Sequence, residues 1–129
     1  MKPITQEWIE KAEGDWATLM REYRARKNPN YDAVVFTHSN AAKSISIARL
    51  QEAGIRFAKT HNLVSLLNDL LPTEPSWKNL YQSSAALTVY AVKFRYPGDK
   101  ADKIEAKEAV KNCRLIRIAV RQSFNLPLK

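Results

Sequence analysis

The sequence has a single cysteine, Cys113, among its 129 residues. One cysteine excludes an intrachain disulfide and a zinc site built from several thiolates. No apolar run approaches the ~20 residues that a membrane-spanning helix requires. Residues 1–7 lack the apolar core of a secretory signal. We therefore expect a soluble, cytoplasmic protein with no membrane segment and no metal site.

Glycine is also scarce, with three residues, and the six prolines lie near the ends of expected segments. The chain has no glycine-rich loop that could hold phosphates, no paired carboxylates and no Ser/His/Asp arrangement. Readings as an ATPase, a Rossmann dehydrogenase or a Ser/His/Asp hydrolase therefore have no residue support, and we expect no cofactor.

What the chain does contain is typical of one globular domain. Hydrophobic residues make up 45% and charged residues 26%, close to the average for such proteins. The length matches the commonest domain size, and no repeat or interior linker is found. We expect a single domain over residues 1–129.

Apolar residues recur at helical spacing along nearly the whole chain, and no strand-like alternation is found. The pattern predicts long helices over about 6–27, 31–53, 76–94 and 101–124, and a short helix over about 62–71. Thr5 and Ser76 are expected N-caps, and Gly54 is expected just after the second helix. Short connections favour antiparallel neighbours, so the predicted fold is an all-α, up-and-down bundle.

The net charge of +8 is concentrated near the C-terminus, because residues 93–129 contain ten Lys/Arg and four Asp/Glu. Six of these cations fall within an arc of roughly 120° on the last predicted helix. This basic stripe consists of Lys103, Lys107, Lys111, Arg114, Arg117 and Arg121. It could follow the phosphates of a nucleic acid, or it could be an ordinary solvated helix face.

A second candidate for nucleic-acid binding precedes this helix. Tyr96 could stack on a base while Arg95 binds a phosphate. Alternatively, Tyr96 packs in the interior before the turn at Pro97. Trp8, Trp16 and Trp77 occur at helical spacing with other apolar residues, so we interpret them as core or dimer-face residues.

The two histidines are weak catalytic candidates. His38 lies on the apolar face of the second helix, and we interpret it as a hydrogen-bonded core or interface residue. Arg56 and His61 could perform ribonuclease chemistry, with histidine as general acid or base and arginine stabilising the charged transition state. The structural alternative is that His61 supports a capping turn formed by Thr60 and Asn62.

Several short motifs occur in a characteristic order along the chain. The first is an opening helix with an aromatic residue and alanine, at residues 8–15. The second begins at Phe36, continues through a pair of alanines and ends with the segment 48–54, and the segment 60–67 follows it closely. The last is Arg95-Tyr96-Pro97, which precedes the closing helix. In this order the chain resembles small prokaryotic HEPN-domain proteins. The resemblance implies a bundle of four main helices and a short one, usually dimeric. Such proteins are often encoded beside a minimal nucleotidyltransferase, and relatives include metal-independent RNases, RNA-binding domains and toxins of toxin–antitoxin pairs.

The sequence departs from this family pattern at two places. Ser39-Asn40 and Lys43-Ser44 replace the Gln-Gln and Glu-Lys pairs common in this branch, and the last helix contains no histidine. The family's catalytic role is therefore not carried over to this chain. Our leading hypothesis is a dimeric binding module for RNA, a nucleotide or a nucleotidyltransferase partner. The alternatives are a metal-independent endoribonuclease and a protein that only forms hetero-oligomers.

Overall fold

The computed structural model describes the backbone of residues 1–93 and 98–128, and the side chains of residues 1–90 and 98–128. Within these residues every regular element is a helix, which confirms the all-α prediction. The elements are α1 (Pro3–Arg24), α2 (Tyr31–Ala53), α3 (Leu63–Leu70), the 3-10 helix η1 (Pro75–Leu80), α4 (Tyr81–Lys93) and α5 (Lys103–Ser123).

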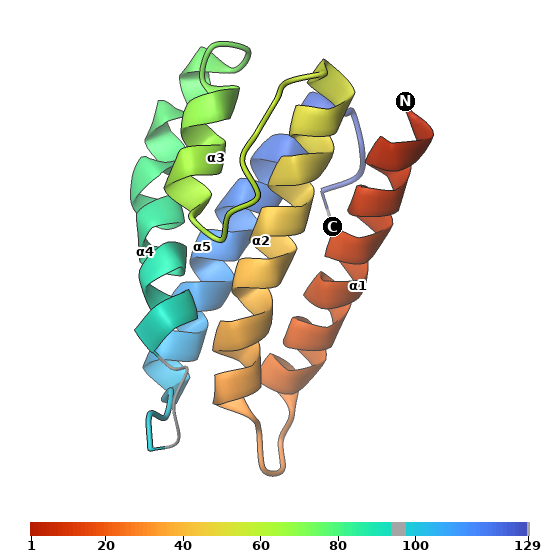
Figure 1. The fold of residues 1–129 in the computed structure, drawn as a ribbon. Coiled ribbons are helices and arrows are strands. Elements are labelled where there is room, and N and C mark those ends of the chain that lie inside the picture. Colours follow the sequence, from red (N-terminus) through yellow and green to blue (C-terminus); the bar gives the residue numbers. More distant parts are fainter. Residues whose placement is uncertain (94–97, 129) are drawn as a thin grey trace.

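The four longer helices alternate in direction and form an up-and-down bundle (Figure 1). α2 occupies the centre and packs against α1, α3, α4 and α5. α1 lies on one side of the bundle, while α3 and α4 lie on the other. α5 packs against α2 and α4 and also touches α1, so the outer edges of α1 and α5 face the same side.

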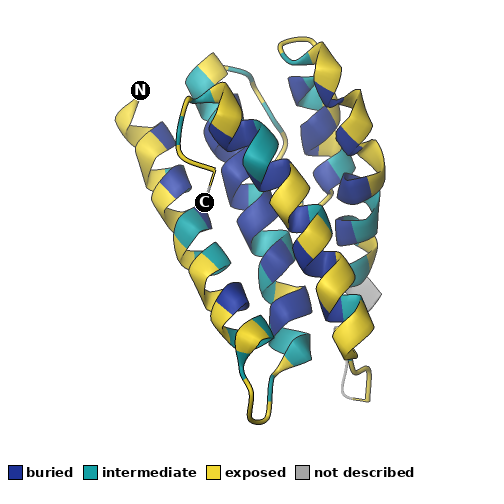
Figure 2. Ribbon diagram, turned by 180° about the vertical axis from the view of Figure 1, so that it is seen from behind, coloured by how far each residue is buried: buried dark blue, intermediate teal, exposed yellow. Residues whose placement is uncertain are grey.

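The central position of α2 follows from its composition. Eleven of its residues are buried, and they occur on every side of the helix rather than along one stripe. A helix that is apolar all round is stable only when other elements surround it. In contrast, α1 and α5 are amphipathic, and Figure 2 shows their exposed residues on the outside of the bundle. Among the described residues, no helix is both long and apolar enough to cross a membrane.

Helix ends follow local capping signals at three places. The Asn62 side chain accepts hydrogen bonds from the backbone amides at the start of α3. Asp102 and Glu105 form a reciprocal capping box at the start of α5. Gly54 follows α2 with a φ of 69°, the left-handed conformation that glycine adopts without strain.

Two predicted N-caps are wrong. α1 begins earlier, at Pro3, whose ring suits the first turn of a helix. Thr5 is consequently buried within α1, where its Oγ1 donates to Glu52 Oε1 at 3.0 Å. The predicted single helix from Ser76 is instead the 3-10 helix η1 followed by α4.

Candidate nucleic-acid interface

The basic stripe on α5 is exposed at its beginning and buried at its end. Lys103, Lys107, Lys111 and Arg114 are exposed, and we call these four residues the exposed stripe. The side chains of Arg117 and Arg121 lie inside, with only 5% and 8% of each residue accessible to solvent. The expectation of a solvent-facing stripe of six cations is therefore wrong for its last two members.

Arg117 and Arg121 are buried because other parts of the chain use their donors. Glu13 of α1 accepts two hydrogen bonds from Arg117, at 2.7 Å and 3.0 Å, and its Oε1 lies 3.2 Å from Arg121 Nη1. The segment after α5 folds back, so that Arg117 Nη1 donates to the carbonyl of Leu128 and Arg121 Nε to that of Pro127. These two arginines join α1, α5 and the C-terminal segment.

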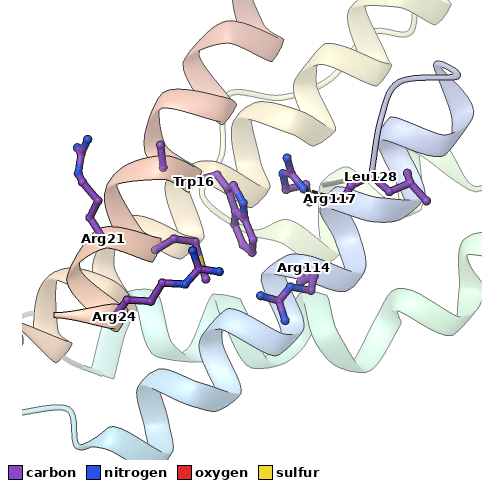
Figure 3. Close-up of a pocket in the computed structure, with 8 residues that line it drawn as sticks. Trp16, Arg21, Arg24, Arg114, Arg117 and Leu128 are labelled. Carbon is purple, nitrogen blue, oxygen red and sulfur yellow. Dashed lines mark hydrogen bonds between the residues drawn. The ribbon is translucent and has the colours of Figure 1, made fainter. Parts of the chain in front are cut away.

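A cleft of about 810 Å³ lies between α1 and α5, beside the buried pair (Figure 3). This volume is within the range of small-molecule binding sites in proteins. The cleft has a mixed apolar and cationic lining. It is formed by Trp16, Ala17, Met20, Arg21, Arg24, Arg114, Arg117 and Leu128.

The charge in this cleft is largely uncompensated. Figure 3 shows Arg24 and Arg114 extending toward each other from the two helices, while Arg21 points away from the cleft. In the part of the chain that the structure describes, no carboxylate lies within ion-pair distance of these three guanidinium groups. An anion entering between Arg24 and Arg114 would meet two positive charges without displacing a carboxylate.

Trp16 stands in the middle of the cleft and is only partly buried. Arg117 Cζ lies 4.9 Å from the ring centroid, and Arg114 Cζ lies 5.6 Å from it. Both distances are typical of cation–π contacts. Trp16 packs against the hydrophobic core, as the sequence predicted. Its ring also forms a wall of the cleft, which the sequence did not predict.

The contribution of α1 to this site was not predicted from the sequence. A signal for it exists, because Trp16, Met20 and Arg24 follow one another at intervals of four residues. This spacing places an aromatic, a flexible apolar and a cationic side chain along one edge of a helix. The predicted candidates Arg95 and Tyr96 lie outside the described residues, and their role stays a prediction.

His38 lies in the core, as predicted, but without the expected hydrogen bonds. It is 0% exposed, and neither ring nitrogen has a partner among the described residues. Its ring centroid is 6.0 Å from that of Tyr90. Burial lowers the pKa of His38 to about 3, so the ring is neutral at physiological pH. A catalytic role would require access to substrate, which this position does not offer.

Arg56 and His61 lie in the exposed connection between α2 and α3. Nδ1 of His61 is 3.4 Å from Nζ of Lys43. Arg56 lines a shallow hollow with residues that include Ser65 and Asp69, and His61 is not part of that lining. Arg56 and His61 therefore do not line a common pocket, and the structure gives no support to their acting together in catalysis. Within the described residues, no group of three or more His, Cys, Asp or Glu side chains is placed to hold a metal ion.

Comparison with known families gives one match. The model of the family described as HEPN domain matches residues 5–123. Neither the curated proteins nor the solved structures gave a match to the chain. The matched region includes nearly all of α1 and the whole of α5, and thus the exposed stripe and most of the cleft lining.

Proposed function

The chain belongs to the HEPN domain family, as its sequence motifs predicted, and from this premise we propose that it is a non-catalytic module that binds RNA. The observation that supports this function is the exposed stripe, whose cations follow one face of α5 over about 17 Å. Cations arranged in this way bind the phosphate backbone regardless of base sequence. Residues 1–129 act as one HEPN-like domain in this proposal.

Binding is favoured over cleavage by the positions of the histidines. The last helix has none, His38 is enclosed in the core, and His61 does not line the hollow at Arg56. A metal-independent RNase would need a histidine and an arginine that can reach the same phosphate. The nuclease alternative therefore rests on family analogy alone.

We also propose that the module is a homodimer. Large apolar side chains are exposed on α2, α4 and α5, among them Phe36 (63%), Val89 (59%) and Ile104 (73%). Exposed apolar groups of this size are typical of interaction surfaces when they cluster. Light scattering tests the proposal: a mass near 29 kDa, twice the 14.7 kDa chain, supports the dimer, and 14.7 kDa contradicts it.

A toxin–antitoxin-like pairing with a minimal nucleotidyltransferase is the family-based extension of this function. Co-expression with the product of an adjacent gene, followed by size-exclusion chromatography, tests it. Co-elution of the two chains would support the pairing. Co-elution together with failure to bind RNA would favour the alternative of a protein that only forms hetero-oligomers.

The RNA-binding proposal is tested by charge reversal on the exposed stripe. Labelled single-stranded RNA is titrated with protein in EDTA, and each sample is divided between native and denaturing gels. We expect a shift with intact RNA for the natural protein and at least tenfold weaker binding for Lys107→Glu/Lys111→Glu.

Lys59→Glu/Lys78→Glu is the matched control, because it changes the net charge equally at two exposed lysines outside α5. It should bind nearly as well as the natural protein. Equal weakening by both variants would contradict a localised site. RNA that is shortened on the denaturing gel, but not by a His61→Ala protein, would establish the nuclease instead.

A further inference from the structure

We propose that residues 125–128, which follow α5, form an autoinhibitory strap that withholds Arg117 and Arg121 from RNA. The inference rests on the proposed function and adds a regulation to it. The basic stripe has six cations, and the strap covers the two that the exposed stripe lacks. With the strap closed, the protein binds RNA less tightly than its cations allow, and opening of the strap extends the RNA surface.

The strap lies against donors of both buried arginines. It turns back at the end of α5 and runs beside α1 (Figure 1). Arg117 Nη1 donates to the carbonyl of Leu128 at 3.2 Å, and Arg121 Nε donates to that of Pro127 at 2.5 Å. A backbone carbonyl carries no net charge. These contacts therefore cover the two guanidinium groups without neutralising them.

One positive charge remains uncompensated behind the strap. The single carboxylate of Glu13 pairs with both Arg117 and Arg121, so it offsets one of their two charges. Arg117 follows Arg114, the last cation of the exposed stripe, by three residues and lies on the same side of α5. The excess charge therefore continues the line of cations along which the RNA backbone is expected to lie.

The strap is attached to the bundle by few contacts. Leu126 packs against the hydrophobic core, and its amide donates to the carbonyl of Arg121 at 2.9 Å. Pro127 and Leu128 are exposed. A segment with few buried apolar contacts opens at a lower cost than the packed helices do. The strap can therefore open while α5 stays folded.

The turn into the strap depends on Asn125. Its φ is 57°, in the left-handed region that asparagine adopts more readily than most other residues. Glycine adopts this conformation without strain, whereas a β-branched residue is strongly disfavoured there. Asn125 is exposed and uncharged. Asn125→Val is therefore a release variant for the strap, and Asn125→Gly is its matched control with the same net charge.

Binding of labelled oligouridylate, measured by fluorescence anisotropy at several salt concentrations, tests the strap. Asn125→Val should bind about five- to tenfold more tightly than the natural protein at about 50 mM salt, because one more phosphate contact forms. Its plot of log K against log salt should be steeper by about 0.7. Asn125→Gly should bind as the natural protein does. Adding Arg121→Gln to Asn125→Val should abolish the gain, since Glu13 then offsets the charge of Arg117 alone.

The arginine Nε–H signals in a proton–nitrogen NMR spectrum report directly on the strap. The signal of Arg121 should shift in Asn125→Val, because its hydrogen bond to Pro127 is lost. The signal of Arg117, whose Nε donates to Glu13, should stay near its natural position and show that the bundle is intact. Asn125→Val/Leu126→Ser also removes the core contact of the strap. It is the second release variant and should give the same gain in RNA affinity.

The strap and the RNA-binding function fail in different ways. An RNA affinity that is unchanged or lower in both release variants would overturn the strap and leave the function intact. The strap is also overturned if neither release variant shifts the Arg121 signal, because the segment is then a fixed part of the bundle. Binding by the release variants alone would support the strap and show that the exposed stripe is insufficient in the natural protein. Absence of binding by all of these proteins at low salt would overturn both proposals.

Discussion

Glu13 is the residue on which the α1–α5 contact depends most. Its single carboxylate is shared by Arg117 and Arg121, both of which are almost completely buried. Moving a charged group out of water is costly, and a buried cation is tolerated only when it is paired and hydrogen-bonded. Removal of this carboxylate would leave two buried guanidinium groups with backbone carbonyls as their remaining acceptors.

We predict that Glu13→Gln lowers the free energy of unfolding by about 2 kcal/mol. Breaking a buried pair costs about 3–5 kcal/mol, and partial exposure of the Glu13 side chain reduces this cost. Urea denaturation at pH 7 measures the change. Glu7→Gln, an exposed carboxylate on the same helix, is the control and should alter stability by less than about 0.5 kcal/mol. Equal stability of the two variants would show that the pairing of Glu13 with Arg117 and Arg121 contributes nothing to the free energy of unfolding.

His38 makes stability depend on pH. Its pKa is about 3 in the folded protein and near 6.5 when the chain is unfolded. The unfolded chain therefore binds more protons between these values. The stability due to the neutral ring is complete above pH 6.5 and falls by about 1.4 kcal/mol per pH unit as pH decreases toward 3.

A His38→Leu variant should remove this dependence. We expect its advantage in unfolding free energy over the natural protein to grow by about 2 kcal/mol between pH 7 and pH 5. Leucine is similar in size and leaves no buried nitrogen without a hydrogen bond. Urea denaturation at both pH values gives the difference. A constant difference would mean that His38 is protonated in the folded protein or reaches solvent.

At the scale of the element, α5 is the helix on which both proposals depend, and its start is fixed by the Asp102–Glu105 capping box. We predict that Asp102→Ala destabilises the protein by about 1 kcal/mol, since backbone amides at the helix start lose their acceptor. Thermal unfolding followed by circular dichroism measures this change. Asp99→Ala, at an exposed position before the helix, should have no comparable effect. A similar loss of thermal stability in both variants would show that the change in net charge, and not the loss of the cap, causes the effect.

Helices were predictable from sequence where local signals determine them. The predicted range 31–53 gave the limits of α2 correctly, because Asn30 caps its start and Gly54 follows its end through contacts within a few residues of each. The start of α1 was predicted wrongly, since Thr5 looks like a cap until Glu52 supplies its partner 47 residues away. The η1 segment was missed because a 3-10 helix and an α-helix share much of their sequence pattern.

The candidate site was only partly predictable for the same reason. Helical periodicity correctly aligned the six cations on α5, but periodicity does not say which of them another helix covers. Arg117 is buried by Glu13, which lies 104 residues earlier in the chain. The cleft likewise exists only because α1 and α5 lie side by side, so neither helix alone reveals it.

At the scale of the whole molecule, the +8 net charge is distributed unevenly. Glu13 compensates one of the two buried charges of the basic stripe, whereas the exposed stripe, Arg21 and Arg24 leave the α1–α5 side strongly positive. A surface of this kind attracts polyanions and accelerates their association, and added salt weakens both effects. The central claim is thus electrostatic and can be measured directly.

The most direct measurement is the affinity for single-stranded RNA as a function of salt concentration. If the four cations of the exposed stripe bind phosphates, log K should fall with log salt with a slope of about −3. The Lys107→Glu/Lys111→Glu protein should bind far more weakly and with a slope nearer about −1. A slope near zero in the natural protein, or no binding even at low salt, would contradict RNA binding through the exposed stripe.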